Sequence, residues 1–403
     1  MTVCAHAGPA YGRRMAGMCV RTPCEPECID DKTHKEVVMS VFSPLALTQA
    51  LPFLPLAQGD IDYEVSRRSD PKLFETVLPD PSTKVILVKD GKVAVPRGQG
   101  AIADYANVKM RLAKLPGAYV AAELNTHPDA MPMFLGTYGG QRGEHVVAVD
   151  ISRVKPMTRT VADHTYEGVD DAFDERDLTE RDSGQSGKSL LENAAERFDW
   201  VDLRGFAPHA SARESGQATS AVSLGVWHAR QRHCPTCGAP TKPALAGWAQ
   251  RCTNEADGNR LLFPRVEPAV ITAIVDHQDR LLLQHNRAWN NPGLYSVSAG
   301  FVEAGENLEH ASRREAKEEV GITLGELKYL GSQPWPFPAS LMMAFKAVAE
   351  STDIHVDGEE TLIARWVTRD EYMNELISGR MEAPGKATIA RYMIEEWLGH
   401  ELP

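Results

Sequence analysis

The stretch of residues 300–322, GFVEAGENLEHASRREAKEEVGI, constrains what this chain can fold into more than any other part of it. Gly300 and Gly305 permit a tight loop whose backbone can approach a phosphate or a metal ion closely. Residues 308–320 then favour a helix, and Gly321 is placed to end it because glycine readily adopts the left-handed conformation of a helix C-cap. The stretch therefore predicts a loop followed by a capped helix.

The predicted helix carries three glutamates on one face. Glu315, Glu318 and Glu319 stand at positions i, i+3 and i+4, so their carboxylates lie within one turn of each other. Three anions at this spacing repel one another, and Mg2+ or Mn2+ would compensate because hard cations prefer oxygen ligands. Arg314 and Lys317 supply part of the opposite charge, and the planar fork of Arg314 can orient a carboxylate. Taken alone, these residues also fit a solvated charged helix.

The spacing of the whole stretch favours the metal site over the solvated helix. Gly300 is followed by Glu306, by the pair Arg314-Glu315 and by Gly321-Ile322. These positions match the Nudix box, and the chain resembles the Nudix hydrolases over residues 265–403. The resemblance implies an α/β/α sandwich for these residues and hydrolysis of a nucleoside diphosphate linked to another group.

A second motif, SQPWPFPAS, occupies residues 332–340. Its prolines hold the segment extended, and Trp335 and Phe337 offer rigid aromatic faces that can stack on a flat heterocycle. A plug of aromatic rings and prolines in the core is the alternative for the motif alone. Together with the box it resembles the NADH pyrophosphatase (NAD+ diphosphatase) branch of the Nudix hydrolases, over about residues 200–403 and only weakly before them.

The resemblance implies which residues form the site. Metal coordination would fall to Glu315, Glu319, Glu360 and the carbonyl of Ala299, with Arg314 and Glu318 beside them. These groups would hold about two or three Mg2+ or Mn2+ ions. Contacts with the dinucleotide would come from Phe263, Phe301, Gln333, Pro334, Trp335, Pro336, Phe337, Pro338, Ala339, Ser340 and Ala390.

The reaction implied is hydrolysis of NADH or NAD+ to AMP and NMNH or NMN. Trp335 and Phe301 would grip a base, most simply the nicotinamide ring, and Glu318 or Glu360 would take the proton of the attacking water. NAD at the 5′ end of RNA contains the same pyrophosphate, so removal of NAD caps is a secondary expectation. The resemblance also implies a homodimer.

The family carries a zinc ribbon, and here the sequence departs from its pattern. Cys234 and Cys237 form one ligand pair, but Cys252 has Glu255 where the other cysteine of the second pair should stand. Structural Zn2+ normally has four protein ligands. Glu255, His233 or a cysteine of the leader could fill the fourth place, or the ribbon keeps its shape without metal.

The patterns predict an α+β protein of several domains. In order, these are a flexible leader at residues 1–40, an N-terminal mixed α/β domain at 41–226 with an acidic disordered insertion near 161–200, a zinc-ribbon-like module at 227–264, and the Nudix domain at 265–403. Asp90-Gly91 predicts a hairpin turn within the N-terminal domain.

Charge and cysteine content limit the partners and the compartment. A net charge of −12 argues against duplex DNA and anionic membranes, since both need clustered cations. No run approaches the roughly 18 apolar residues of a membrane span. Seven cysteines at low density form no disulfide framework, and no apolar run follows Arg13-Arg14, so we expect a cytoplasmic protein.

Two other functions fit the same residues. One is a Nudix hydrolase of another substrate such as ADP-ribose, against which the Trp-Pro-Phe-Pro segment argues. The other is a Nudix-like nucleotide sensor without catalysis, against which the complete set of glutamates argues, because a sensor does not need metal ligands.

Overall fold

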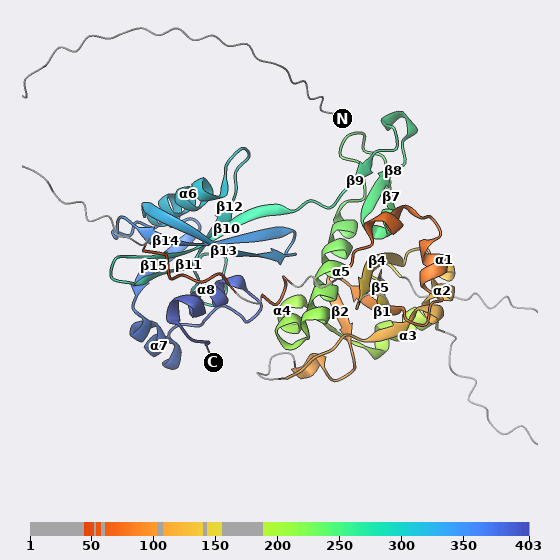
Figure 1. Ribbon diagram of the computed structural model, residues 1–403, viewed down its shortest axis with the longest axis horizontal. Coiled ribbons are helices and arrows are strands. Elements are labelled where there is room, and N and C mark those ends of the chain that lie inside the picture. The colour runs from red at the N-terminus through yellow and green to blue at the C-terminus, as the bar shows by residue number, and fades with distance from the viewer. Residues whose placement is uncertain are drawn as a thin grey trace, which may run out of the picture. The chain divides into compact units, whose positions relative to one another are not determined.

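The computed structural model describes residues 44–51, 54–57, 61–102, 108–139, 143–154 and 188–402. The predicted leader and residues 161–187 of the predicted insertion lie outside these ranges. Three sheets follow one another along the described chain (Figure 1). None of the helices in these ranges is both long enough and apolar enough to cross a bilayer.

The first sheet and its helices form the N-terminal domain. The strands have the order β4-β5-β1-β2-β6, with β3 paired to β1. They are β1 (Lys84–Lys89), β2 (Lys92–Val95), β3 (Lys114–Pro116), β4 (Met131–Tyr138), β5 (Glu144–Asp150) and β6 (Asp199–Val201). The helices are α1 (Leu73–Val77), α2 (Gly117–Thr126), α3 (Leu190–Arg197), α4 (Leu203–Phe206) and α5 (Ala212–Arg230). Apolar residues of α4 and α5 pack on one face of this sheet and those of α1 and α3 on the other.

The hairpin predicted at Asp90-Gly91 is confirmed. It joins β1 to β2, which pair antiparallel. Asp90 has φ 50° and Gly91 has φ 73°, the two positive values that a two-residue type I′ turn requires.

The acidic insertion predicted for residues 161–200 does not extend over residues 189–200, where the prediction was wrong. These residues form α3 and most of β6. Ser189 and Glu192 make a reciprocal capping box at the start of α3. The Asp199 carboxylate accepts hydrogen bonds from the N–H groups of Gly98, at 2.7 Å, and Gly100, at 3.0 Å. These acids therefore serve as a cap and a loop anchor, roles that a count of charges does not reveal.

A small three-stranded sheet follows, of β7 (Thr241–Ala244), β8 (Ala249–Cys252) and β9 (Leu261–Leu262). Residues 233–262, which contain this sheet and the three described cysteines, are called the cysteine module below.

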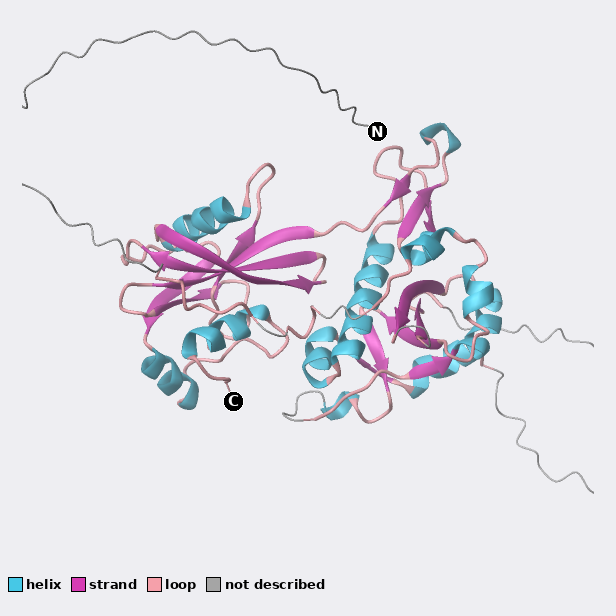
Figure 2. Ribbon diagram, in the orientation of Figure 1, coloured by secondary structure: helices cyan, strands magenta, loops and turns pink. Residues whose placement is uncertain are grey.

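The third sheet forms the C-terminal domain and confirms the predicted α/β/α sandwich. Its order is β13-β14-β10-β11-β15, with β12 paired to β10. The strands are β10 (Glu267–Val275), β11 (Leu281–Asn286), β12 (Ser298–Phe301), β13 (Leu324–Trp335), β14 (Ser340–Ala349) and β15 (Thr361–Val367). The helices are α6 (Leu308–Val320), α7 (Arg369–Ile377) and α8 (Ile389–Leu398). Ala316 and Val320 of α6 pack on one face of the sheet, and Met393 and Trp397 of α8 pack on the other. Figure 2 shows helices on both sides of this sheet.

Residues 44–51 and Leu54 pack with the C-terminal domain, although the sequence assigned residues from 41 onward to the N-terminal domain. The Leu51 N–H donates to the Leu330 carbonyl of β13 at 2.9 Å, and Leu51 and Leu54 join the core of the C-terminal domain. The Lys328 ammonium donates to the Leu45 carbonyl at 3.0 Å.

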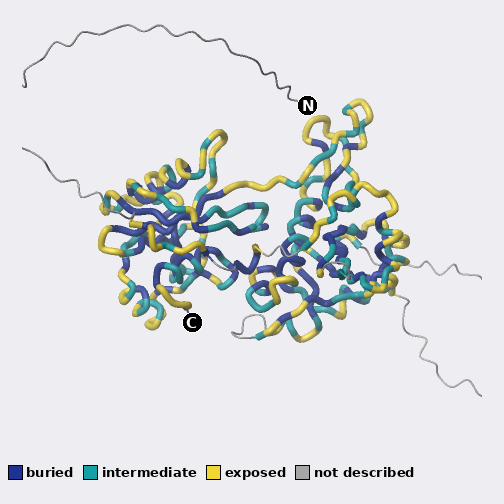
Figure 3. Tube along the Cα trace, in the orientation of Figure 1, coloured by how far each residue is buried: buried dark blue, intermediate teal, exposed yellow. Residues whose placement is uncertain are grey.

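The strands of the two large sheets are mostly buried, and many of the turns between them are exposed (Figure 3).

Candidate active site

Helix α6 begins and ends where the sequence predicts. The Asn307 side chain accepts a hydrogen bond from the His310 N–H at 2.8 Å and caps the first turn. Gly321 has φ 74°, and its N–H donates to the Lys317 carbonyl at 3.1 Å. The apolar face of the helix is buried against the sheet, so its glutamates lie along the border between the core and solvent.

Arg314 binds three of the acidic side chains at once. Its Nε and Nη2 donate to the two carboxylate oxygens of Glu306 at 3.0 and 2.9 Å. Its Nη1 donates to Glu315 and to Glu318, both at 2.9 Å. This hydrogen bonding lowers the pKa of Glu306 to about 2. A single guanidinium thus fixes the geometry of a cluster of anions, as its planar fork allows.

Glu315 lies directly against the backbone of β12. A Cβ atom added at Gly300 would lie 2.0 Å from the Glu315 Cδ, so this carboxylate keeps its position only while residue 300 has no side chain. Burial raises the pKa of Glu315, while the hydrogen bond from Arg314 opposes that rise.

Glu319 is the most deeply buried glutamate of the helix, with 4% of its surface exposed. Its Oε2 accepts a hydrogen bond from Gln284 Nε2 at 2.6 Å and another from Ser298 Oγ at 3.2 Å. Burial raises the pKa of Glu319 to about 7, and the charges of Glu315 and Glu360 raise it further, against these two hydrogen bonds.

Glu360 reaches the same region from a different part of the chain. It directly precedes β15, and its N–H donates to the Asp357 carboxylate at 3.1 Å. Its charge acts on both Glu315 and Glu319. The structure therefore places Glu360 within electrostatic range of Glu315 and Glu319, the other two predicted carboxylate ligands.

These donors fit the metal ions that the sequence predicts. Glu315, Glu319 and Glu360 offer hard oxygen atoms, and the charge of Glu360 raises the pKa of both Glu315 and Glu319. A divalent cation would reverse that effect, because it favours the charged form of every carboxylate that it touches. Ala299, the fourth predicted ligand, lies on β12 next to Gly300.

The predicted substrate-binding residues fall into two groups. Gln333, Met342, Ala269 and Phe301 form one row of paired residues across β13, β14, β10 and β12. Ala390 of α8 covers the same sheet, and the Gln333 amide donates to the Ala387 carbonyl at 3.0 Å. Phe301 is 55% exposed and can receive a flat ring.

The second group is the turn between β13 and β14. Trp335 and Phe337 meet edge to face at 4.9 Å and pack against the core of the N-terminal domain. The Arg204 guanidinium lies 3.8 Å from the Phe337 ring centre and 5.2 Å from that of Trp335. These rings are already partly covered by protein, as the alternative of a plug of aromatic rings and prolines predicted for this motif alone.

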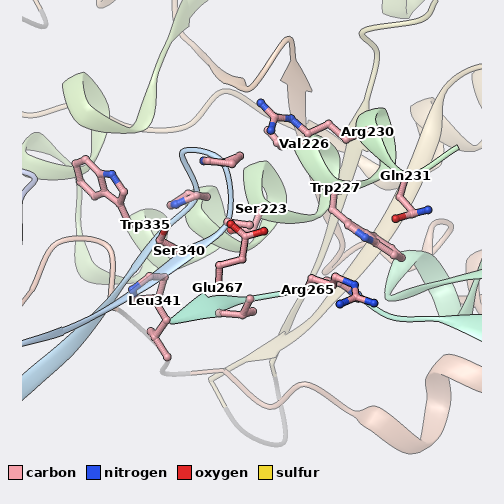
Figure 4. A pocket seen from close by; sticks show the side chains of 16 residues that line it. Ser223, Val226, Trp227, Arg230, Gln231, Arg265, Glu267, Trp335, Ser340 and Leu341 are labelled. Atoms are coloured by element: carbon pink, nitrogen blue, oxygen red, sulfur yellow. The ribbon is translucent and has the colours of Figure 1, made fainter. Parts of the chain in front are cut away.

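A pocket of about 420 Å3 adjoins this turn (Figure 4). Pro334, Trp335, Pro336, Pro338, Ala339 and Ser340 line it, as does the segment Pro264–Glu267. Trp227, Arg230 and Gln231 of α5 and its C-cap line the rest, together with Ser223 and Val226. Phe263, another predicted contact, precedes Pro264 and is 58% exposed.

The cysteine module holds a group of four possible metal ligands. One ligand atom from each of Cys234, Cys237, Cys252 and Asp257 lies within 4.8 Å of the others. The Cys237 and Cys252 sulfurs are 3.5 Å apart, and the Cys234 sulfur is 3.3 Å from Asp257 Oδ2. Thiolates around a tetrahedral Zn2+ stand about 3.8 Å apart, so the group fits such an ion. Asp257 is the fourth member of this group, whereas the sequence suggested Glu255, His233 or a cysteine of the leader for the fourth place.

Sequence reasoning missed three further polar residues of these sites. Gln284 could have been noticed, because it is a polar residue within the apolar strand LLLQHN. Ser298 and Asp257 carry no comparable signal, since serine and aspartate are common in such loops and strand ends.

Family models match three consecutive regions of the chain. Residues 82–227 match the NADH pyrophosphatase-like rudimentary NUDIX domain, residues 229–261 the NADH pyrophosphatase zinc ribbon domain, and residues 265–390 the NUDIX domain.

The chain is also similar to individual proteins. "NAD-capped RNA hydrolase NudC" of Mycobacterium bovis (strain BCG / Pasteur 1173P2) is 41% identical over 210 residues, which cover 50% of this chain and 66% of that protein. "NAD-capped RNA hydrolase NUDT12" of Homo sapiens is 37% identical over 194 residues, which cover 46% and 42%. The chain thus spans just under two thirds of the first relative and less than half of the second. Among solved structures, a NUDIX hydrolase from Nitrosomonas europaea is 20% identical with a TM-score of 0.34, covering 42% of this chain and 94% of that one.

Proposed function

Since this chain belongs to the NADH pyrophosphatase family of Nudix hydrolases, we propose that it hydrolyses the pyrophosphate bond of NADH or NAD+ to AMP and NMNH or NMN. The observation that carries this proposal is the acidic cluster of α6. Arg314 holds Glu315 and Glu318 of this helix, and Glu319 lies beside them within the electrostatic range of Glu360, which precedes β15. A solvated charged helix explains neither the burial of Glu319 nor the packing of the Glu315 carboxylate against the backbone of Gly300.

The metal ligands that we propose are Glu315, Glu319, Glu360 and the carbonyl of Ala299, holding about two or three Mg2+ or Mn2+ ions. When bound, these ions would neutralise charge on the pyrophosphate and make a bound water more acidic. Arg314 would keep Glu315 in place, since it donates to that carboxylate at 2.9 Å. Glu318 or Glu360 would accept the proton of the attacking water, because both carboxylates border the cluster.

Phe301 is the aromatic platform that the geometry favours for a substrate base. Its ring is more than half exposed, and it shares a cross-strand row with Gln333 on the sheet that Ala390 covers. The turn from Pro334 to Ser340 would line the other side of the substrate, with Trp335 and Phe337 held in place by the N-terminal domain. Nicotinamide is the simplest ring for the Phe301 platform.

We also propose that the enzyme removes NAD from the 5′ end of RNA. The relatives named above are NAD-capped RNA hydrolases, and a capped RNA contains the same pyrophosphate. Arg230 and Arg265 support the proposal, because they line the pocket beside the β13–β14 turn and form no ion pair within the described ranges. Cations of this kind can contact the phosphates of a single strand even in an acidic protein.

The cysteine module is proposed to hold one structural Zn2+ through Cys234, Cys237, Cys252 and Asp257. We further propose a cytoplasmic homodimer. The three described cysteines are free thiols, as is usual in reducing compartments. Phe263 and Val266, which are three residues apart in the chain, each expose more than half of their surface, and exposed apolar side chains of this kind favour an interaction site.

Side-by-side assays of NADH, NAD+, ADP-ribose and NAD-capped RNA, each with Mg2+ and with Mn2+, test the proposed function. The highest kcat/KM is expected for NADH, NAD+ or NAD-capped RNA. Preference for ADP-ribose would assign the chain a different substrate, and the absence of turnover on all four would favour a nucleotide sensor.

A further inference from the structure

Glu319 is held through only one of its two carboxylate oxygens. Gln284 and Ser298 both donate to Oε2. Within the described chain, neither a hydrogen bond nor an ion pair reaches the other oxygen, Oε1. The two oxygens of this buried carboxylate are therefore in different environments.

The donors to Glu319 are neutral, unlike those of the neighbouring glutamates. Arg314 binds Glu306, Glu315 and Glu318 but makes no hydrogen bond to Glu319. An arginine or lysine would offset the charge of the carboxylate that it holds. An amide and a hydroxyl fix the position of Glu319 and leave its negative charge for a cation.

Packing does not explain why a glutamine occupies residue 284 of β11. Its side chain is on a strand whose leucines, Leu281–Leu283, are buried, and it is itself 5% exposed. The amide group that faces a carboxylate must be the NH2, so the amide oxygen points elsewhere. That oxygen is buried without a hydrogen-bond partner among the described residues, a cost that an apolar residue at this position would avoid.

We propose that Gln284, assisted by Ser298, is a positioning residue for metal binding: it fixes Oε2 of Glu319 and thereby presents Oε1 to the divalent cation. The inference rests on the proposed function, because it requires Glu319 to be a metal ligand. It adds two residues from β11 and the start of β12 that support the ligand from behind.

The test is Mn2+ binding by the full-length Gln284→Met variant without nucleotide, measured by calorimetry. Methionine keeps the length of the side chain and removes the donor. We expect Mn2+ to bind about ten- to a hundredfold more weakly, the usual effect of losing a residue that orients a metal ligand. At saturating Mn2+, the KM for NADH should stay within about twofold of the wild type, since Gln284 is not among the proposed substrate contacts.

Gln217→Met is the matched control. Gln217 is also a fully buried glutamine, and neither of its amide atoms has a hydrogen-bond partner in the described chain, but it lies on α5 of the N-terminal domain. Its replacement should leave Mn2+ affinity unchanged. Ser298→Ala should weaken Mn2+ binding less than Gln284→Met, because its hydrogen bond is the longer of the two.

Unchanged Mn2+ affinity in a folded Gln284→Met variant would overturn the inference, as would a lowered Tm with unchanged Mn2+ affinity. If this variant does not fold, Gln284→Asn replaces it, since the shorter amide cannot reach Glu319 from the same backbone position. If the wild type binds Mn2+ and hydrolyses NADH, and either Gln284 variant binds Mn2+ as tightly as the wild type, the role of Gln284 is refuted and the proposed function stands. A wild-type protein that does neither would remove the proposed function itself.

Discussion

Replacement of Gly300 by alanine tests whether Glu315 must lie where the structure places it. The added Cβ would be 2.0 Å from Cδ and 2.2 Å from Oε1 of Glu315. Ordinary van der Waals contact begins at 3.4 Å, so the carboxylate must retreat by about 1.4 Å or β12 must move. Either change takes Glu315 away from the position in which Arg314 holds it.

We expect the kcat of Gly300→Ala for NADH to fall at least about a hundredfold at saturating Mg2+ or Mn2+, because a misplacement of about 1 Å already costs about that much. The fold should survive, since Gly300 lies in a strand and alanine is compatible with its backbone conformation. Steady-state kinetics and the Tm of the same preparation measure the two effects. Gly385→Ala is the control: a Cβ there meets no atom within 4 Å, so activity should be unchanged.

A folded Gly300→Ala protein whose kcat stays within about threefold of the wild type would refute this reasoning. Glu315 would then tolerate displacement, and its proposed role as a metal ligand would have to be abandoned.

Four further predictions concern separate parts of the molecule. Glu319→Gln should lower kcat at least about a hundredfold, as loss of a key electrostatic group does, and near-normal kinetics in the folded variant would remove Glu319 from the site. Phe301→Ala should remove about 1–3 kcal/mol of stacking energy, which lowers kcat/KM for NADH but changes kcat/KM for ADP-ribose little. Trp335→Ala should lower kcat/KM equally for both substrates, because Trp335 packs on the N-terminal domain. The reverse pattern of kcat/KM values would assign the nicotinamide contact to Trp335. The wild-type protein should contain about one zinc ion per chain; Asp257→Ala should lower this content and the Tm, while Asp257→Cys should retain zinc. Equal zinc content in the wild type and both variants would contradict Asp257 as the fourth zinc ligand. Burial lowers the pKa of His228, so the folded state favours the neutral imidazole. The contribution of His228 to the free energy of unfolding should be fully present above the unfolded pKa of about 6.5 and should fall as the pH drops below that value. His228→Gln should therefore make the Tm depend less on pH, and an unchanged dependence of Tm on pH would contradict this prediction.

The helix and turn boundaries that the sequence determined by itself are those set by residues close together in the chain. Helix α6 ends at Val320 as predicted, because Gly321 supplies the left-handed cap, and Asn307 marks its start. The hairpin at Asp90-Gly91 follows from two residues that tolerate positive φ. Hydrogen bonds of caps and turns span only a few residues, so the residues themselves reveal them.

The glutamate face of α6 was likewise readable, because the spacing of Glu315, Glu318 and Glu319 alone puts their side chains together. The likeness of two motifs to one family then named Glu360 and Gln333, which spacing could not have selected.

Tertiary structure alone decided how these groups are supported. Gln284 reaches Glu319 because β11 and α6 pack on each other, across 35 residues of sequence. Asp257 completes the cysteine group because β8 and the turn after it fold back on Cys234. Trp335 is held by Arg204, which belongs to another domain. Such contacts depend on strand register and on the packing of distant elements, and no short pattern in the sequence encodes either of these.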